Sequence, residues 1–309
     1  MPKFGAHMSI AGGVSQAFDR GEAIGCDTIQ LFTKNNRQWK APPLKPEEVE
    51  RFHQRHQETG IDPVVAHASY LLNVASPKAE TWQRSYDALL VELERCDVLD
   101  IPYLVLHPGS HMGKGVEAGV RKVAEAINRA HAERNPKAMI CLEVTAGQGD
   151  SLGASFEELA AIIEAVNEPE RVGICFDTCH ALAAGYDLTT DEGYAETFEA
   201  FERLLGFERL KVFHFNDSKG GIGSRLDRHV HIGLGACGLE CFRRIINDPR
   251  FAHLPMILET PKGPDMAEDV INLRVLRGLV EGAADPTTPE KVQALWAEAE
   301  AASRTGGKT

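Results

Sequence analysis

The sequence predicts a single α/β domain in which eight parallel strands, each followed by a helix, close into a (β/α)8 barrel with an additional short C-terminal helix. Three observations support this fold. Short apolar runs alternate with longer amphipathic stretches along the chain, there are eight such pairs, and polar residues gather where the apolar runs end. Such alternation predicts a parallel sheet, and eight repeats close it into a barrel. A chain of 309 residues suffices for one such domain.

Each predicted strand is a short run rich in apolar and β-branched residues that ends at a polar residue or a turn. Nearly continuous apolar runs such as VVAH and ICFD are typical of strands buried on both faces. In chain order, we expect the strands at residues 4–9, 28–33, 63–67, 103–107, 138–143, 172–177, 210–215 and 256–259.

The segments between the strands carry apolar residues at helical spacing. We expect helices at residues 13–24, 46–59, 78–99, 116–133, 155–166, 191–205, 239–247 and 265–282. Pro46 suits the first position of its helix, and Ser155 with Glu158 predicts a capping box. The TIM-barrel domain should therefore occupy residues 1–282. Residues 283–309 should add a turn-rich linker, a short helix at 290–302 and a frayed polar tail.

Composition narrows the class of protein. The formal net charge of −12 disfavours a broad basic surface for nucleic acid, so attraction to a polyanion would need a local patch or bound cations. The seven cysteines are scattered, and we interpret them as packing residues in a reducing cytoplasm. No apolar run approaches the roughly twenty residues of a membrane span. The first residues lack the layout of a signal peptide.

Nine candidate metal ligands lie at the ends of predicted strands or in the segments that follow them. They are His67, His107, Glu143, Asp177, His180, His214, Asp227, His229 and Glu259. In a barrel of this type, residues at the carboxyl ends of the strands form the active site. A long, glycine-rich loop is expected at residues 216–238, and two of its residues, Asp227 and His229, would complete a separate site with His180.

This set is richer in imidazole and carboxylate than one ion requires, and imidazole favours zinc. A single histidine at a strand end is more often structural, and acidic residues before turns are often caps. Nine unpaired ionisable groups in one pocket, however, would cost roughly several kcal/mol each. We therefore predict a multinuclear site, which is typical of phosphodiester hydrolysis. His7 fits either a structural role or the orientation of a ligand.

The chain resembles the endonuclease IV family of apurinic/apyrimidinic endonucleases over residues 1–282. The resemblance is carried, in order, by GAHMSIAGG, LFTKNNRQWK, HASYLLN, LHPGSH, LEVTAGQG, GICFDTCHALAAGYD, HFNDSKGGIGSRLDRHVHIGLG and ILETP. It implies a DNA-repair enzyme with three Zn²⁺ ions per chain, with Mn²⁺ as an alternative at one or more positions. Cleavage would fall 5′ to an abasic site and give a 3′-hydroxyl and a 5′-deoxyribose phosphate.

The resemblance also assigns residues. It places His67, His107 and Glu143 on one zinc. Asp177, His214 and Glu259 would hold a second that Glu143 bridges to the first, and His180, Asp227 and His229 would hold the third. Glu143 and Glu259 are the expected catalytic residues, as ligands of the pair that activates water. The expected DNA contacts, on the loops after strands two and three, are Lys34, Arg37, Gln38, Trp39, Tyr70 and Leu71.

In the family, these two loops enter the minor groove of double-stranded DNA and displace the abasic nucleotide. Apolar wedges offset lost stacking there, and an abasic site resists extrusion least. Trp39 and Tyr70 could instead simply cover the barrel rim. Further basic residues near this face are Lys40, Lys219, Arg225, Arg228 and Lys262. We expect a monomer that does not bind membranes, is cytoplasmic and associates with the nucleoid when acting on DNA.

Two other functions remain to be distinguished. A one-metal sugar isomerase or epimerase of the same barrel superfamily would need only Glu143, Asp177, His214 and Glu259, and the five other ligands would have no task in it. A protein that only recognises damaged DNA would need Arg37, Tyr70 and Leu71 but no complete ligand set. Metal content and cleavage of an abasic duplex separate the three.

Overall fold

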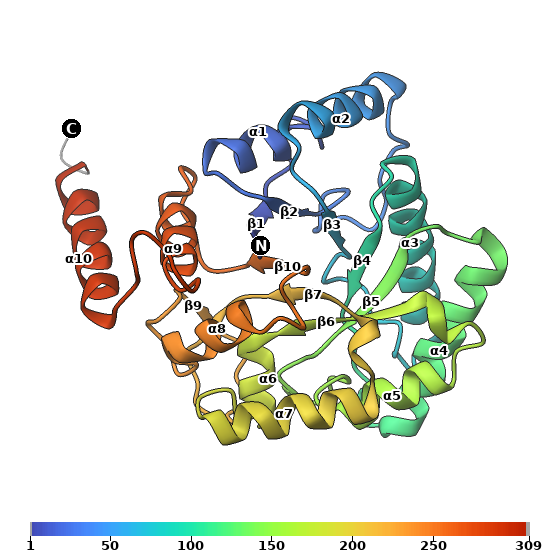
Figure 1. Cartoon of the computed structure of the whole chain (residues 1–309). Helices are drawn as coiled ribbons and strands as arrows, with labels where there is room; N and C mark the ends of the chain where they lie inside the picture. The colour runs from blue at the N-terminus through green and yellow to red at the C-terminus, as the bar shows by residue number, and fades with distance from the viewer. Residues whose placement is uncertain (1, 307–309) are drawn as a thin grey trace.

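The computed structural model describes residues 2–306 and forms the predicted closed barrel. Eight parallel strands follow one another around it in the order β1–β2–β3–β4–β5–β6–β7–β10, and β10 pairs with β1 to close it (Figure 1). The strands are Lys3–Met8 (β1), Thr28–Leu31 (β2), Val64–His67 (β3), Tyr103–Leu106 (β4), Met139–Glu143 (β5), Val172–Asp177 (β6), Leu210–His214 (β7) and Pro255–Leu258 (β10). All eight expected strands are confirmed to within two residues at either end.

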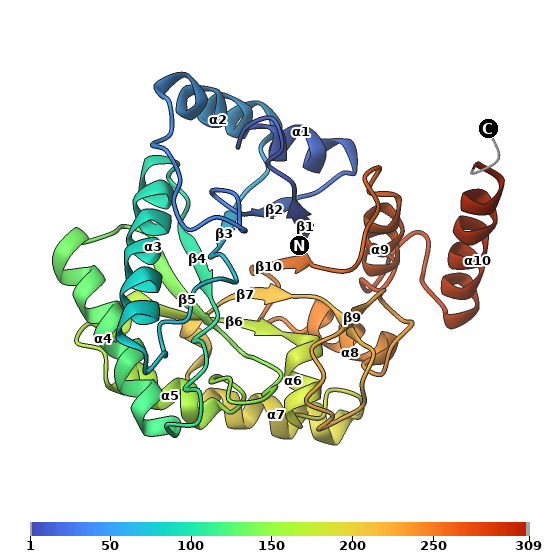
Figure 2. The same ribbon diagram turned by 180° about the vertical axis from the view of Figure 1, so that it is seen from behind.

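The expected helices surround this barrel, as both views show (Figures 1 and 2). They are Gln16–Ala23 (α1), Pro46–Thr59 (α2), Ala79–Val98 (α3), Val116–Arg134 (α4), Phe156–Glu164 (α5), Asp191–Leu204 (α7), Gly238–Asn247 (α8) and Ala267–Arg277 (α9). Half of the predicted capping box forms: Ser155 Oγ accepts from the Glu158 N–H at 3.2 Å. The Glu158 carboxylate accepts instead from the Gly153 and Ala154 N–H groups, before the cap.

Five short elements of the described residues were not predicted: two 3-10 helices, Pro169–Arg171 and Phe207–Arg209, and three elements near the ligands. A helix, Thr178–Ala184 (α6), directly follows β6, and a two-stranded antiparallel sheet pairs Asp217–Ser218 (β8) with His229–Val230 (β9). Every residue of α6 is buried except Ala184, so the helix lacks the polar face that a sequence pattern would reveal. Strands of two residues are too short for any periodicity. The helix and the small sheet both lie where the sequence places metal ligands.

The C-terminal helix, Pro289–Gly306 (α10), is longer than expected and lies outside the ring beside α9 (Figures 1 and 2). Trp296 and Val292 are buried, and the Trp296 ring stacks on His231 with 3.9 Å between centroids. The helix includes the first four residues of the predicted polar tail, while residues 307–309 lie outside the described part. The division into 1–282 and 283–309 stays a prediction. None of the helices within residues 2–306 has the length and apolar character of a membrane span.

The barrel interior explains how the strands position polar groups. Six buried side chains, one from each of the strands β3–β7 and β10, form a small apolar cluster of their own: Val65, Val105, Cys141, Cys175, Val212 and Ile257. Side chains two positions apart on a strand point to the same face. Two positions beyond these residues stand His67, His107, Glu143, Asp177, His214 and Glu259. The apolar cluster is therefore the floor of the polar centre. The cysteines are all free and buried, as predicted.

Candidate metal centre

The nine predicted ligands converge at the carboxyl end of the barrel and divide into three groups. In each group the donor atoms lie within 4.8 Å of one another. A zinc ion about 2 Å from every donor keeps those donors within about 4 Å of one another, so the spacing fits coordination after small adjustments. The groups are His67–His107–Glu143 (first), Glu143–Asp177–His214–Glu259 (second) and His180–Asp227–His229 (third). They are the same three sets that the family resemblance implies.

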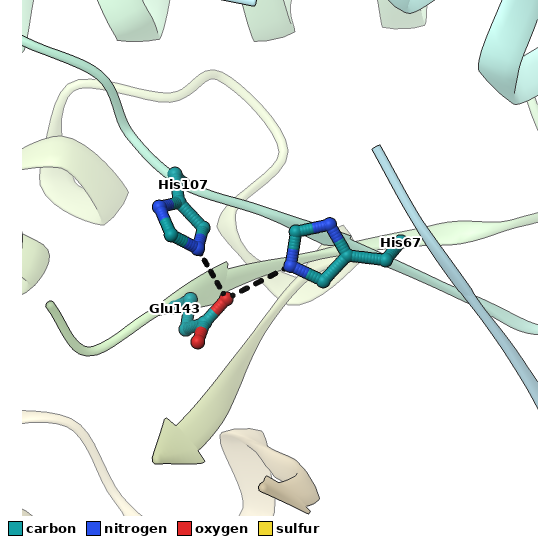
Figure 3. A group of neighbouring side chains, drawn as sticks. All are labelled: His67, His107 and Glu143. Atoms are coloured by element: carbon teal, nitrogen blue, oxygen red, sulfur yellow. Dashed lines mark hydrogen bonds and ion pairs between the residues drawn. The ribbon is translucent and has the colours of Figure 1, made fainter. Parts of the chain in front are cut away.

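Glu143 connects the first group to the second. One carboxylate oxygen, Oε2, lies 3.2 Å from His67 Nε2 and 2.9 Å from His107 Nε2, as Figure 3 shows. The other oxygen, Oε1, lies 3.1 Å from His214 Nδ1. Glu143 is the last residue of β5 and its side chain is fully buried. Both carboxylate oxygens therefore face histidine side chains and not solvent. This geometry suits a carboxylate that bridges two ions.

The second group is the most deeply buried. The side chains of Asp177 and His214 are fully buried, and His214 Nδ1 lies 3.3 Å from Glu259 Oε2. Asp177 also caps α6, since its Oδ1 accepts from the His180 N–H at 2.8 Å. Asn216 donates from its side-chain amide to Asp177 Oδ2 at 2.7 Å. Its side-chain oxygen accepts from the Glu259 N–H at 2.8 Å.

The third group is the most open to solvent. His180 Nε2 lies 3.2 Å from Asp227 Oδ1 and 3.4 Å from His229 Nε2. The Asp227 side chain is 43% exposed and that of His229 is 16% exposed. His229 belongs to β9 and Asp227 precedes it in the long loop, so the small sheet places both beside α6. A second donor set at this point, Asp177, Cys179 and His229, shares members with the main groups.

The hydrogen bonds of the imidazoles fix which ring nitrogen faces each group. The Nδ1 atoms of His67, His180 and His229 lie 2.6 Å, 2.9 Å and 3.2 Å from backbone carbonyl oxygens, which can only accept. Each Nδ1 therefore donates to a carbonyl, and each Nε2 is the ring nitrogen that faces the centre and would bind an ion there. Metal-binding histidines are typically oriented in this way. The residues present therefore fit a set of zinc-type ions.

Charge at the centre is balanced between imidazoles and carboxylates. Burial lowers the pKa of His214, but Glu259 and Glu143 outweigh it and raise the pKa to about 9. Burial also opposes protonation of His107, but Glu143 raises its pKa overall. Although burial raises the pKa of Glu143, His107 and His214 hold it well below its usual range. The carboxylates therefore require positive partners, which are imidazolium groups or metal ions.

The two predicted DNA-contact loops lie at the rim beside the first group. Arg37 and Gln38 are exposed, Leu71 is partly exposed, and Trp39 packs partly on the core with Arg84 4.5 Å from its ring centroid. Tyr70 is 58% exposed and its ring lies 5.1 Å from that of His67. The structure thus places an exposed aromatic ring beside the first group, and contact of this ring with DNA is the role expected from the sequence. That role stays a prediction.

Lys34 does not occupy the position expected of a DNA contact. Its side chain is 1% exposed, and its Nζ lies 3.2 Å from Glu92 Oε1 and donates to the Gln38 carbonyl at 2.9 Å. Glu92 also accepts from the Ser69 N–H. Lys34 and Glu92 thus connect the loop after β2 to the loop after β3, from beneath. Lys262 is likewise occupied, by Asp269 and the His7 carbonyl.

A pocket of about 380 Å³ opens between the rim and the first group. His67, Tyr70, His107 and Asp227 line its metal side. Its lining also includes the polar side chains of Asn73, Ser110, Gln148 and Ser151. A volume of this size is in the range of small-ligand sites. The pocket therefore brings Tyr70, members of the first and third groups and several hydrogen-bonding side chains to one cavity.

Two residues that contact the ligands, Gln30 and Asn216, are not among those predicted from the sequence. Both are fully buried polar residues. Gln30 stands within the apolar run TIQLF, where a buried amide needs partners, and this was the available signal. Asn216 follows His214 by two positions and falls in a loop whose most visible feature is its glycine content. His7, for which the sequence leaves two roles open, has its Nδ1 2.9 Å from Gln30 Nε2.

Comparison with known proteins agrees with this geometry. The model of the xylose isomerase-like TIM barrel family matches residues 18–277. The chain is 58% identical over 284 residues to a probable endonuclease 4 of Chloroflexus aurantiacus, covering 92% of this chain and 100% of the relative. It is 50% identical over 277 residues to a probable endonuclease 4 of Geobacter sulfurreducens, covering 89% of this chain and 94% of the relative.

Solved structures show the same likeness. Endonuclease IV from Thermus thermophilus superposes with a TM-score of 0.80 at 40% identity, covering 91% of this chain and 100% of that one. A D-tagatose 3-epimerase-like protein superposes with a TM-score of 0.70 at 18% identity, covering 90% of this chain and 97% of that one. The second likeness concerns the barrel fold alone.

Proposed function

This chain belongs to the endonuclease IV family of xylose isomerase-like TIM barrels, and on that premise we propose that it is a zinc-dependent endonuclease that cleaves DNA at abasic sites. The bond cleaved is the phosphodiester 5′ to the abasic sugar, and the products are a 3′-hydroxyl and a 5′-deoxyribose phosphate. Removal of 3′-blocking groups belongs to the same proposal, because it is the same chemistry at a strand end.

One observation carries the proposal: nine donor residues form three adjoining groups that meet at Glu143 and Asp177. The first group would hold one zinc ion, the second another with Glu143 shared, and the third a separate ion. Mn²⁺ is the alternative at one or more positions. When bound, ions of this kind activate water as a nucleophile and neutralise charge on phosphoryl oxygens.

The protein side chains supply position and access. Tyr70 and Leu71 would wedge into the duplex, while Arg37, Gln38 and Trp39 contact the strand from the neighbouring loop. The pocket that Tyr70 lines would receive the extruded sugar and phosphate. A sugar without a base leaves the duplex at the lowest cost, so the wedge favours abasic DNA.

The acidic net charge is compatible with a DNA substrate because the positive charge is local. Arg37, Lys40, Lys219, Arg225 and Arg228 are all exposed in the loops around the centre. The formal charge of −12 is a value for the whole chain, and it includes acidic residues on surfaces that need not contact DNA. Bound divalent ions would add positive charge at the point where the phosphate lies.

The deciding experiment is incision of a duplex that carries one synthetic abasic site, by metal-replete protein with magnesium chelated. We expect a single nick 5′ to the site, and about three zinc ions per chain by elemental analysis. One manganese or magnesium ion per chain and no nick would favour the isomerase or epimerase. Tight binding to the abasic duplex without any nick would favour a recognition protein.

A further inference from the structure

Gln30 is a fully buried polar residue of β2 that belongs to none of the three ligand groups yet contacts two members of the second. We propose that Gln30 is a positioning residue that orients His214 Nδ1 and Glu259 Oε2 toward the interior of the second group, where these two atoms would bind an ion. This inference rests on the proposed function, because it concerns how the zinc ligands are held.

The hydrogen bonds of Gln30 allow only one orientation of its amide. Nε2 donates to Glu259 Oε1 at 2.6 Å, and Oε1 accepts from His214 Nε2 at 2.7 Å. The reverse orientation would set an amide oxygen against a carboxylate oxygen and two N–H groups against each other. The second hydrogen of Nε2 points to His7 Nδ1 at 2.9 Å. All three polar contacts of this buried amide are therefore used in a single arrangement.

The contact with His214 distinguishes this imidazole from three others of the centre. His67, His180 and His229 each bind a backbone carbonyl through Nδ1 and present Nε2 to the centre. His214 is reversed: its Nε2 is held by Gln30, and its Nδ1 faces the carboxylates of the second group. Gln30 therefore supplies the acceptor for this ring that the main chain supplies for the other three.

The contact with Glu259 fixes the other ligand. With Oε1 bound to Gln30, Oε2 lies 3.3 Å from His214 Nδ1, inside the second group. The main chain of Glu259 is held separately, by Asn216 at its N–H and by His229 at its carbonyl. Backbone contacts alone therefore do not orient the carboxylate. Gln30 Nε2 is the nearest side-chain donor to Oε1, at 2.6 Å, while His7 Nδ1 lies farther from the same oxygen, at 3.6 Å.

The barrel geometry explains why β2 has this task. Strands β3–β7 and β10 each end in or next to a ligand candidate, whereas β1 and β2 carry His7 and Gln30 at the same end. The barrel closes through β1 between β2 and β10, which brings Gln30 within reach of Glu259 and, beyond it, of His214 on β7. The strands β1 and β2 thus supply no ligand of their own, but their side chains contact the ligands on β10 and β7.

The test compares Gln30→Met with Thr28→Val. Met is close to Gln in length and has neither an amide donor nor an amide acceptor. Thr28 is the matched control, since it lies on the same strand, is equally buried and donates its side-chain hydroxyl to the Pro63 carbonyl, away from the centre. Zinc affinities are measured by competition with a chromophoric chelator, and cobalt-loaded protein is followed by its visible absorption. Both readouts are independent of cleavage.

We expect Gln30→Met to weaken one of the three zinc sites by about 10–100-fold, the usual effect of losing such a partner, while the other two keep their affinity. The cobalt absorption of that one site should change as well. Thr28→Val should lower the melting temperature without changing any zinc affinity. Affinities within about twofold of wild type in Gln30→Met, or equal weakening of all sites in both variants, would overturn the proposal.

A second measurement keeps the inference testable if Gln30→Met does not fold. In zinc-loaded wild-type protein with ¹⁵N-labelled histidine, His214 should have a protonated Nε2 and a metal-bound Nδ1, opposite to His67, His180 and His229. The same orientation in all four rings would refute the role of Gln30. Wild-type protein that binds no zinc would contradict the proposed function itself. Normal zinc loading and cleavage by the wild type, together with unchanged zinc affinities in Gln30→Met, would contradict only this inference.

Discussion

Glu259→Gln is the substitution whose outcome the geometry determines most closely. Glu259 Oε1 accepts from Gln30 Nε2 at 2.6 Å, so in the variant the new amide should keep its oxygen on that side. Its NH₂ group would then replace Oε2 beside His214 Nδ1, and an NH₂ group has no lone pair for a metal ion. The second group would retain three of its four ligands. The backbone bonds of residue 259 to Asn216 and His229 involve no side-chain atom of Glu259, so the fold should persist.

The magnitude follows from comparison with weaker perturbations. Loss of a hydrogen-bonding partner behind a ligand typically costs about 10–100-fold in metal affinity or activity. Loss of the ligand itself should cost at least as much, so we expect kcat to fall by about 100-fold or more. Since each tenfold in rate is about 1.4 kcal/mol, this corresponds to at least about 2.7 kcal/mol of transition-state stabilisation.

The assay is single-turnover incision of an abasic duplex, with binding to the same duplex measured separately and zinc content determined on the same samples. Glu240→Gln is the control, because Glu240 is an exposed residue of α8 that pairs with Arg243. We expect wild-type duplex binding and about one zinc fewer per chain for Glu259→Gln. Wild-type kcat and full zinc content would refute the role of Glu259 as a ligand.

Further outcomes are expected for Tyr70, for the titration of His214 and for the two basic residues Lys34 and Arg37. Tyr70→Ala should weaken binding to abasic duplex more than to undamaged duplex, while Tyr70→Phe retains the preference; equal losses on both duplexes would reduce Tyr70 to a surface contact. Because the pKa of His214 is raised to about 9, its protonation should stabilise the metal-free fold below about pH 6.5, with that stability lost as pH rises through 9. Zinc binding should accordingly release protons at about pH 7 but few at about pH 10. Calorimetry in buffers of different ionisation enthalpy measures this release, and no release at the lower pH would contradict the prediction. Lys34→Met should destabilise the fold by up to roughly 3–5 kcal/mol, because the buried Glu92 carboxylate loses its cation and keeps only hydrogen bonds from neutral groups, while Arg37→Ala should lower only duplex affinity. Unchanged urea denaturation of Lys34→Met with weaker DNA binding would instead restore Lys34 as a direct contact.

The barrel could be predicted from the sequence because its strands are buried on both faces and its helices on one. Continuous apolar runs such as that of β6 and helical spacing such as that of α2 are direct consequences of this burial. The short helix α6 could not be predicted, because nearly all its residues are buried and the pattern of a solvent-facing helix is missing. The sheet of β8 and β9 could not be predicted for a different reason, since each of its strands has only two residues and carries no periodic signal.

The candidate site was foreseeable to the extent that ligands end strands. His67, Glu143 and Asp177 do so directly, and parallel strands bring their carboxyl ends together. The residues that hold the ligands were not foreseeable in the same way. Gln30 and Asn216 act through side-chain contacts with residues distant in sequence, and the family resemblance assigns Lys34 to a DNA contact on the loop after the second strand. Only the packing of α3, which brings Glu92 beneath that loop, reveals that Lys34 is buried.

The exposure of the ligand side chains differs among the three groups, and it indicates which groups a substrate would reach first. The His107 side chain in the first group is 31% exposed and Asp227 in the third is 43% exposed, whereas Asp177 and His214 in the second are fully buried. A phosphate that enters from the pocket would therefore meet the first and third groups before the second. Exposed ligands can adjust to a substrate, but buried ones must already be oriented when it arrives. The dense hydrogen bonding by Gln30 and Asn216 is found at the second group, where such orientation is needed most.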